Sequence, residues 1–463
     1  MNLDLIVKNG WVVLPDEVRK LDIGIRDGRI EAIAESLEDY SADAYLDVGG
    51  QHVLPGMIDS HVHFNEPGLG HWEGFASGSA ALAAGGCTTY VDMPLNGNPP
   101  TVSVEALKLK LAKAKGCSVV DYTLWGGLVP EQEDQLEKLA AEGIVGFKAF
   151  MSNPGGEGEG RFREIDDWTL FEGMKRIASV GGFVALHAES DLITTRLAKE
   201  AAVAGKNDAI AFITSRPVIA ELEAVNKALL FAEHTGCPVH FVHISAPVTV
   251  HLIQRAKDRG LEVTVETCPH YLLLTDQDMI ELGPIAKCAP PLRSAAQQEE
   301  MWELLSKGYL DIIGSDHSPS PPNMKFGEGL TFTQAWGGIS GAQSSLELMV
   351  GEGYLKRGIP LTVLTKMLSS NPAKRFGLYP RKGEIAIGAD ADLAIVDTNH
   401  TYKLLPEHLL YRHQQSPYVN RTIHCRVTTT LCRGKKVYVL DEGITLPAEG
   451  QSLLENRMGS VAI

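Results

Sequence analysis

The chain has 463 residues, of which 44% are hydrophobic and 22% charged, as is typical of a globular protein with one large core or two to three ordinary domains. Its formal net charge of -16, without any segment dense in Lys and Arg, argues against a nucleic-acid partner, because binding a polyanion requires a concentrated basic surface. Apolar runs shorter than the roughly 18–20 residues of a membrane span, and seven scattered cysteines without a C-x-x-C motif, favour a cytoplasmic protein with reduced thiols and no membrane partner.

Both ends of the chain are predicted to be rich in β-strands. Residues 4–33 alternate apolar and polar side chains and contain turn signals, which is the pattern of short strands joined by tight turns. Residues 383–397 and 426–443 have the same character. These β-rich ends enclose a middle part of a different kind.

The middle part alternates apolar strands with helix-like segments such as 169–179 and 224–236, the pattern of βα units around a parallel sheet. Eight candidate strands follow one another, at residues 52–64, 87–94, 121–128, 144–151, 183–190, 238–245, 261–272 and 311–319. Eight repeats predict an α/β fold of the (β/α)8 TIM-barrel type. A doubly wound sheet is the alternative, which is disfavoured because no glycine-rich phosphate loop follows the first strand.

Histidine and carboxylate side chains lie at the C-terminal ends of these strands, the face on which barrel enzymes carry out their chemistry. The first strand ends in an H-x-H motif, and strand alternation places the imidazoles of His61 and His63 on the same side. Strands five, six and eight end in His187, His243 and Asp316. Each of these is, on its own, more often a hydrogen-bonded polar residue than a ligand. Four strands that converge on one mouth favour a site for a divalent ion such as Zn²⁺, Co²⁺ or Mn²⁺.

Lys148 ends the fourth strand, within the apolar stretch "IVGFKAF". An ammonium in the same site would be repelled by bound cations, and both burial and nearby positive charge lower the pKa of a lysine. A neutral amine can add carbon dioxide to form a carbamate, an anion whose two oxygens can bridge metal ions ~3.5–4 Å apart in a two-metal hydrolytic site. The alternative is a lysine that reaches water or pairs with an acid. We predict that Lys148 is carboxylated and bridges two divalent ions.

Several segments together resemble the cyclic amidohydrolases, the family of dihydroorotases, hydantoinases, dihydropyrimidinases and allantoinases. The resemblance is carried by "PGMIDSHVHFNEPG" around the H-x-H motif, the lysine of strand four, the two single histidines, and "GSDHSP" after strand eight. It covers nearly the whole chain and implies that residues 54–375 form a metal-dependent hydrolase barrel. It also implies that both chain ends form one small β-sandwich, residues 1–53 its N-terminal part and 376–463 its C-terminal part and tail, and that the protein is a homotetramer.

The same resemblance implies a role for each candidate ligand. His61 and His63 would hold the more buried of two divalent ions, and the histidines of strands five and six would hold the more exposed one. Lys148, carboxylated on its side-chain nitrogen, would bridge the two ions. Asp316 would bind the buried ion and move protons.

Further motifs are most similar to the allantoinase group of the family, among them "DMPLNGNPPTV", "KCAPPLR", "AWGGISGAQSS" and "YRHQQSPYVNRTI". Asn65 stands where dihydroorotases place an arginine that binds a substrate carboxylate, so an uncharged substrate such as allantoin is expected. Asn153 stands where hydantoinases carry a tyrosine that helps to hold the ring amide, and the sequence does not reveal its replacement. The family implies backbone contacts to substrate near Ala289 and Trp336; the alternative for Trp336 is a loop anchor that does not touch substrate.

The reaction implied is hydrolytic opening of the ring amide of allantoin to give allantoate, in purine catabolism. A hydroxide shared by two cations would attack the carbonyl carbon, and Asp316 would first accept and then return a proton. The alternative is a hydantoinase or dihydropyrimidinase that acts on another cyclic ureide. A non-catalytic scaffold or a metal-storage or metal-sensing protein is disfavoured, because all six ligand positions are filled.

Residues beside these motifs are assigned supporting roles. His270 and His317 are expected to orient loops or ligands without binding metal, and Cys288 either lines the pocket or is a structural thiol. The glycine-rich residues 152–164 are interpreted as a mobile surface loop, either a lid or a solvated connection.

Overall fold

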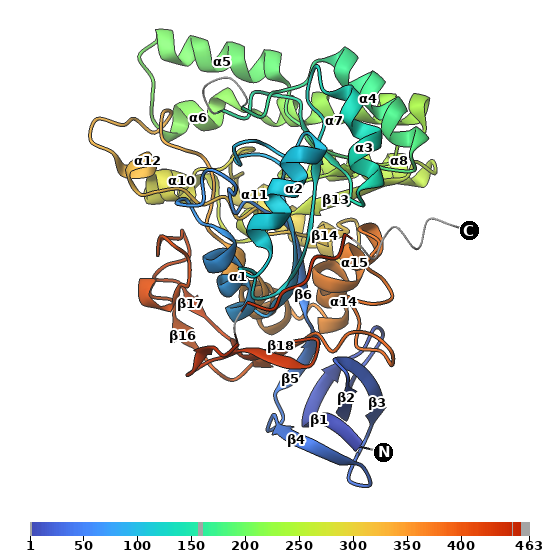
Figure 1. Ribbon diagram of the computed structural model, residues 1–463. Helices are drawn as coiled ribbons and strands as arrows, with labels where there is room; N and C mark the ends of the chain where they lie inside the picture. Colours follow the sequence, from blue (N-terminus) through green and yellow to red (C-terminus); the bar gives the residue numbers. More distant parts are fainter. Residues whose placement is uncertain (1, 156–160, 447, 455–463) are drawn as a thin grey trace.

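The computed structural model describes residues 2–155, 161–446 and 448–454 (Figure 1). Its parallel strands pair in two sheets, of three and six strands. The first sheet has the order β6 (Met57–Val62), β7 (Cys87–Asp92) and β8 (Asp121–Leu124). The second contains β9 (Gly126–Gly127), β10 (Phe147–Phe150), β11 (Val184–His187), β12 (Val239–Phe241), β13 (Val263–Thr267) and β14 (Ile312–Ile313), each paired with the next.

Hydrogen bonds link the two sheets at both ends. At one end only Trp125 separates β8 from β9, and the amide of Val145, just before β10, donates to the carbonyl of Leu124 at 3.0 Å. At the other end the amide of His63 donates to the carbonyl of His317 at 2.8 Å, so the segment after β14 lies beside the end of β6. The first and last parallel strands are therefore neighbours.

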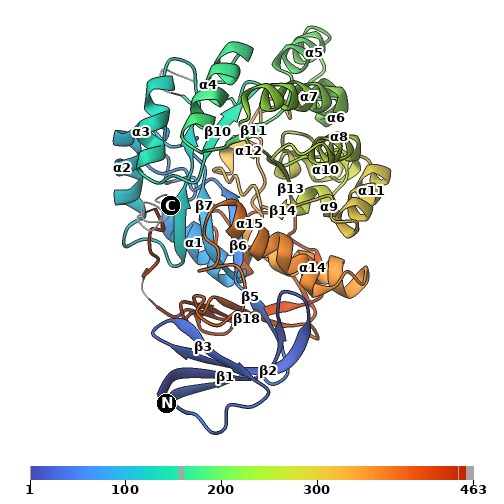
Figure 2. The ribbon, with the colours of Figure 1, turned by 90° about the vertical axis from the view of Figure 1, so that its right-hand side faces the viewer.

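Helices lie on the outside of the parallel strands (Figure 2). The α-helices are α1 (Phe75–Ala84), α2 (Val104–Ala114), α3 (Leu136–Ala141), α4 (Asp167–Ser179), α5 (Asp191–Val203), α6 (Ala209–Ser215), α7 (Val218–Thr235), α8 (Pro247–Asp258), α9 (Pro269–Leu273), α10 (Asp276–Leu282), α11 (Ala295–Ser306), α12 (Asn323–Phe326), α13 (Ser345–Met349), α14 (Leu361–Thr365) and α15 (Asn371–Arg375). In α4 the buried residues Leu170, Met174 and Ile177 recur at the spacing of one helix face. The carboxylate of Asp166 caps this helix by accepting the Thr169 amide at 2.7 Å.

Both chain ends contribute to one nine-stranded sheet. Its N-terminal strands are β1 (Asn2–Val13), β2 (Val18–Arg26), β3 (Arg29–Ala34), β4 (Ser41–Asp47) and β5 (His52–Pro55), and its C-terminal strands are β15 (Leu393–Asp397), β18 (Arg426–Cys432), β19 (Lys435–Val439) and β20 (Gly443–Ile444). The two halves meet where β5 pairs with β15 in antiparallel register. All nine strands belong to one hydrogen-bonded sheet. In it, the first part of β1 pairs with β4 and its last part pairs with β5, both in parallel register. A short separate sheet joins β16 (Tyr402–Lys403) to β17 (Thr422–Ile423).

The first predicted strand, residues 52–64, is divided between these two parts of the molecule. Its start is β5 of the nine-stranded sheet, and its continuation is β6 of the parallel sheet. The chain crosses at Gly56, where a Cβ would lie 2.2 Å from the Thr88 hydroxyl, so only glycine fits this close approach. No helix in the described ranges combines the length and apolar character that crossing a bilayer would need.

Candidate metal centre

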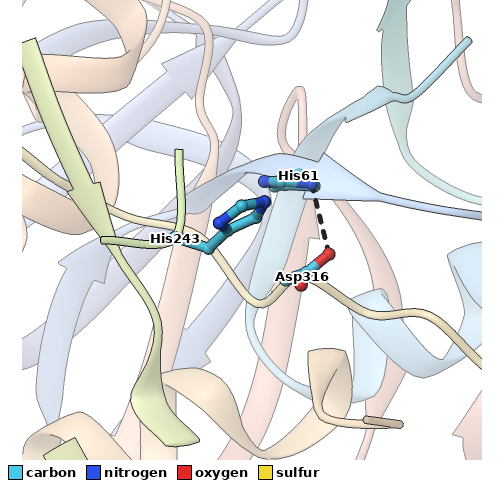
Figure 3. Close-up of side chains that lie close together, drawn as sticks. All are labelled: His61, His243 and Asp316. Atoms are coloured by element: carbon cyan, nitrogen blue, oxygen red, sulfur yellow. Dashed lines mark ion pairs between the residues drawn. The ribbon is translucent and has the colours of Figure 1, made fainter. Parts of the chain in front are cut away.

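Three of the six predicted ligands come from strand ends far apart in sequence and lie together. His61 ends β6, His243 follows β12 and Asp316 follows β14, and one ligand atom from each lies within 4.8 Å of the others (Figure 3). His61 Nε2 is 3.2 Å from Asp316 Oδ1. Two imidazoles and a carboxylate in this arrangement are suitable donors for a borderline divalent cation.

The other predicted ligands border this cluster. His63 Nε2 is 3.2 Å from the same Asp316 oxygen, and His187 Nδ1 is 3.1 Å from His243 Nε2. The positive charge of Lys148 is among the causes that lower the pKa values of His63, His187 and His243, after the larger effect of burial. All six predicted positions therefore belong to one buried neighbourhood.

Glu266, on β13, orients His61. Its carboxylate accepts from His61 Nδ1 at 2.7 Å and from the Ser60 hydroxyl at 2.6 Å, and it lies 3.4 Å from His240 Nε2. This contact fixes the tautomer of His61, because a proton on Nδ1 leaves Nε2 as the lone-pair donor. Burial opposes the charge on Glu266, but the neighbouring His61 and His240 outweigh it and hold the pKa of this carboxylate well below its usual range.

A second carboxylate orients His187. Glu189 accepts from His187 Nε2 at 2.8 Å and is itself bound by the guanidinium of Arg216. Burial would raise the pKa of Glu189, yet the charge of Arg216 and the bond from His187 lower it to about 2. The Phe150 ring stacks on His187 with centroids 4.6 Å apart. These contacts leave Nδ1 of His187 directed at His243.

Two of the candidate ligands have strained backbones. His243 and Asp316 have φ angles of 40° and 46°, in the left-handed region that residues other than glycine rarely occupy. Such residues cost of order 1–3 kcal/mol each and cluster at functional sites. The strain turns both side chains toward His61 at the ends of β12 and β14.

Several buried polar atoms of the centre have no hydrogen-bond partner among the residues that the structure describes. They are Lys148 Nζ, His63 Nδ1 and His243 Nδ1. Lys148 is fully buried, and burial lowers the pKa of its amine to about 8. Unpaired donors and acceptors are costly inside a protein. These atoms fit a centre that is completed by cations and by a carboxyl group on Lys148.

Residues 52–437 match the amidohydrolase family. The chain belongs to the amidohydrolase family.

Relatives of similar length are known from several bacteria. The chain is 47% identical to an allantoinase of Deinococcus radiodurans, over 95% of this chain and 96% of the relative. It is 48% identical to an allantoinase of Rubrobacter xylanophilus, over 96% of both chains, and 43% identical to one of Salmonella choleraesuis, over 99% and 100%. Among solved structures, the L-hydantoinase (dihydropyrimidinase) of Arthrobacter aurescens superposes with a TM-score of 0.93 at 35% identity, over 97% of this chain and 99% of that one. A dihydropyrimidinase of Brevibacillus agri gives 0.88 at 29% identity, over 97% and 98%.

The residues predicted to contact substrate differ in their surroundings. Asn65 is buried with a φ of 65°, and its side-chain oxygen has no partner. Trp336 is half-buried, its indole packs edge-on against Trp72 with centroids 4.9 Å apart, and its Nε1 is buried without a partner. Ala289 is partly buried. Asn153 is exposed, and its side-chain oxygen accepts the Gly155 amide at 2.8 Å, so it does not take the place of the hydantoinase tyrosine.

The supporting residues are also placed by the structure. The Nδ1 atom of His317 accepts the Gly341 amide at 3.2 Å, and its Nε2 is 3.5 Å from the Glu73 carboxylate. His270 and Cys288 are buried, and burial lowers the pKa of the histidine to about 4 and raises that of the thiol. Part of the glycine-rich segment 152–164, which was interpreted as either a lid or a solvated connection, lies outside the described residues, namely residues 156–160.

Sequence reasoning missed the residues that orient the ligands. Glu266, His240, Glu189 and Arg216 were not singled out. Glu266 carried a usable signal, since a carboxylate in the apolar stretch "LEVTVET" is as unusual as the lysine in "IVGFKAF".

Proposed function

We propose that the chain hydrolyses the ring amide of allantoin to give allantoate, as an allantoinase of purine catabolism. The observation that carries the proposal is the identity of 47% and 48%, over 95% and 96% of this chain, to proteins named allantoinase. The buried, uncharged Asn65 supports an uncharged substrate, because its side-chain oxygen, which has no partner among the described residues, can accept a hydrogen bond from a ureide N–H.

The proposed cofactors are two divalent ions, Zn²⁺ or else Co²⁺ or Mn²⁺, and a carboxyl group from carbon dioxide on Lys148. The residues proposed to hold the ions are His61, His63, Lys148, His187, His243 and Asp316. When bound, such ions supply Lewis-acid stabilisation of the carbonyl oxygen and lower the pKa of water from 15.7 to about 7. The unpaired Lys148 amine and the two unpaired imidazole nitrogens support this assignment.

The protein's own part in the reaction is proton transfer and orientation. Burial opposes a charge on Asp316, but His61 and the hydrogen bond from His63 outweigh it and hold the pKa of Asp316 well below its usual range. The carboxylate is therefore ready to accept a proton from the attacking water at neutral pH. Once protonated, it can pass the proton to the ring nitrogen, which leaves poorly as an anion. Glu266 and Glu189 keep the imidazoles in one tautomer throughout.

We also infer the larger arrangement. The two parallel sheets are proposed to form one closed (β/α)8 barrel, with β8 and β9 as a single interrupted strand, and both chain ends a small β-sandwich. The links at Val145 and His317 and the likeness to the L-hydantoinase support this. The proposed parts are residues 1–53, 54–375 and 376–463, with β5 running across the first boundary to Pro55. The homotetramer rests on the family resemblance, and the seven free cysteines support a cytoplasmic location.

The second candidate is a hydantoinase or dihydropyrimidinase, which the 0.93 TM-score to the L-hydantoinase favours. A kinetic comparison of metal-loaded protein on allantoin, hydantoin, 5,6-dihydrouracil and dihydroorotate separates the two. We expect the highest kcat/KM for allantoin and no measurable turnover of dihydroorotate. A kcat/KM for hydantoin well above that for allantoin would reverse the assignment.

Replacement of Asp316 by Asn tests the proton-transfer step. Asp316→Asn keeps the shape of the side chain and an oxygen donor but loses the basic carboxylate. We expect kcat to fall by at least about 10²–10⁴-fold, the usual contribution of a general acid–base group. Bound metal should stay above half of the wild-type content, as measured by elemental analysis. Near-normal turnover would remove Asp316 from proton transfer.

A further inference from the structure

Two buried lysines lie apart from the candidate metal centre and have no part in the proposed reaction. Lys287 and Lys325 are 4% and 2% exposed. In the described part of the chain neither ammonium forms an ion pair with a carboxylate. Burying a cation without a counter-charge is expensive unless its donors are all satisfied. Their hydrogen bonds therefore indicate what the two lysines stabilise.

Lys287 lies in the segment between α10 and α11, and its side-chain nitrogen is within hydrogen-bond distance of three main-chain oxygens. Its Nζ lies 2.9 Å from the Phe332 carbonyl, 2.9 Å from that of Thr333 and 2.6 Å from that of Ala335. The ammonium also lies 4.7 Å from the centroid of the Phe212 ring. Lys287 thus binds three carbonyls within four consecutive residues.

Lys325 lies in α12 and is bound in the same way. Its Nζ donates to the carbonyls of Pro284 at 3.0 Å, Trp336 at 3.1 Å and Gly338 at 2.7 Å. In return, the amide of Gly338 donates to the carbonyl of Lys287 at 2.7 Å. Five of the six carbonyls bound by the two lysines therefore belong to residues 331–338, which we call the tryptophan loop.

These contacts fix the path of the main chain. An ion pair would hold only a side chain, whereas a bond to a carbonyl holds the backbone itself. Thr333 and Gln334 of the tryptophan loop are exposed, and the other contacts that hold this part of the loop include the Thr333 amide, which donates to the Asn207 carbonyl at 3.2 Å, and the Phe332 ring, which packs on Phe212. The two lysines add five hydrogen bonds to the main-chain carbonyls of this loop.

The tryptophan loop places Trp336 against the segments that follow β6 and β10, the strands that carry His61 and Lys148. Its indole packs on Trp72, in the loop after β6, the strand that ends in the H-x-H motif. A Cβ built on Gly155, in the loop after the strand of Lys148, would lie 3.9 Å from the Trp336 ring. Any displacement of the tryptophan loop would therefore move the indole relative to Trp72 and Gly155.

We propose that Lys287 and Lys325 are positioning residues that clamp the tryptophan loop, so that Trp336 closes one side of the substrate site between the loops after β6 and β10. The role in substrate binding rests on the proposed function. The clamp itself does not, because it can be measured without substrate.

The test uses Lys287→Met and Lys325→Met, which keep an apolar side chain of similar length, with Lys113→Met on an exposed face of α2 as the matched control. Hydrogen exchange is followed at the amides of Trp336 and Gly338, which are bonded to the carbonyls of Met324 and Lys287. We expect exchange at these amides at least about tenfold faster in either clamp variant. Bound metal should be unchanged, and KM for allantoin should rise by about ten- to a hundredfold with a smaller change in kcat.

Unchanged exchange in the tryptophan loop of both variants would overturn the clamp, whatever the kinetics. Faster exchange with an unchanged KM would overturn the positioning role. If the wild-type protein opened none of the cyclic ureides, the proposed function would be wrong. Hydrogen exchange would still test the clamp, because it requires no substrate. Lys325→Leu and Lys287→Leu, which also lack a side-chain donor, replace a Met variant that does not fold; full wild-type protection in both would likewise contradict the proposal.

Discussion

Glu266 acts on the candidate metal centre through a single imidazole. Its carboxylate accepts a hydrogen bond from His61 Nδ1 at 2.7 Å, and the Nε2 atom of the same imidazole lies 3.2 Å from Asp316. In Glu266→Gln the negative charge is lost. The amide nitrogen of Gln must then face the hydroxyl or the imidazole N–H that donates to the carboxylate in the wild-type protein. Loss of such a hydrogen-bond partner costs roughly 10–100-fold in metal affinity, so we expect that loss with the fold retained. Competition with a metal chelator measures it, and Glu303→Gln, on an exposed helix face, should bind metal normally.

Lys148 leads to a pH-dependent prediction for the metal-depleted protein. Burial lowers the pKa of its amine to about 8, and only the neutral amine can add carbon dioxide. The neutral fraction grows as pH rises through this value and is nearly complete above it. At a fixed concentration of dissolved carbon dioxide, the rate of reactivation by added metal should therefore rise with pH and level off above about pH 8. A rate that fell with pH over this interval would contradict a carboxylated lysine.

The candidate ligands could be predicted from the sequence. Side chains alternate along a strand, and the C-terminal ends of neighbouring parallel strands lie on the same face of a barrel. These two rules predicted that His61, His243 and Asp316 converge, and the structure places their ligand atoms within 4.8 Å of one another. The bond between Glu189 and Arg216, 27 residues apart, depends on how the loops pack and had no local signal. Glu266 was missed although the argument used for Lys148 applies to it.

At the scale of elements, the third predicted strand shows where local patterns fail. Residues 121–128 were predicted as one strand, but the pairing partner changes at Trp125. The Trp125 amide donates to the carbonyl of Asp92 on β7, whereas the Gly126 amide donates to the carbonyl of Gly146, just before β10. The Trp125 side chain is fully buried, and its indole N–H donates to the carbonyl of Ser60 at 3.1 Å. A continuous apolar run carries no mark of such a change of partner.

The path of β14 leads to an element-scale prediction. Gly314, directly after this strand, leaves room for two side chains of the centre: a Cβ there would lie 2.9 Å from Glu266 Oε2 and 3.1 Å from His61 Cβ. Gly314→Ala should push the carboxylate away from the imidazole and lower metal affinity by about tenfold or more. Gly351→Ala, where the nearest atom is 3.7 Å away, is the control. Metal affinity is measured by chelator competition. Equal affinity in both variants would show that β14 can shift to accommodate the added methyl group without weakening metal binding.

At the scale of the whole molecule, the sequence indicated that the two chain ends share a structure but not how that structure is joined to the parallel strands. One junction is made by the end of the described chain, where Tyr122 on β8 donates to the carbonyl of Gln451 at 2.9 Å and the amide of Leu453 donates back at 2.8 Å. The other is a buried cluster of charges. Contacts between residues hundreds of positions apart leave no periodic pattern in the sequence.

Lys382 is the centre of that cluster. Its ammonium lies 2.6 Å from Asp392, 2.8 Å from Asp121 at the start of β8 and 3.2 Å from Asp390, and its side chain is 1% exposed. The lysine therefore ties β8 to the segment before β15. Lys382→Met would leave three buried carboxylates without their shared cation, and breaking a buried pair in this way costs about 3–5 kcal/mol.

The matched control is Lys374→Met. Lys374 is 51% exposed and pairs with Glu384 at 2.8 Å, so its loss should cost less than about 1 kcal/mol. The free energy of unfolding is measured by urea denaturation of metal-free protein, so that metal loss does not contribute to the difference. A cost for Lys382→Met as small as that of the control would mean that Arg433 beside Asp121, Arg381 beside Asp390 and entering water compensate the three carboxylates, and that Lys382 is not needed to hold β8 to the C-terminal strands.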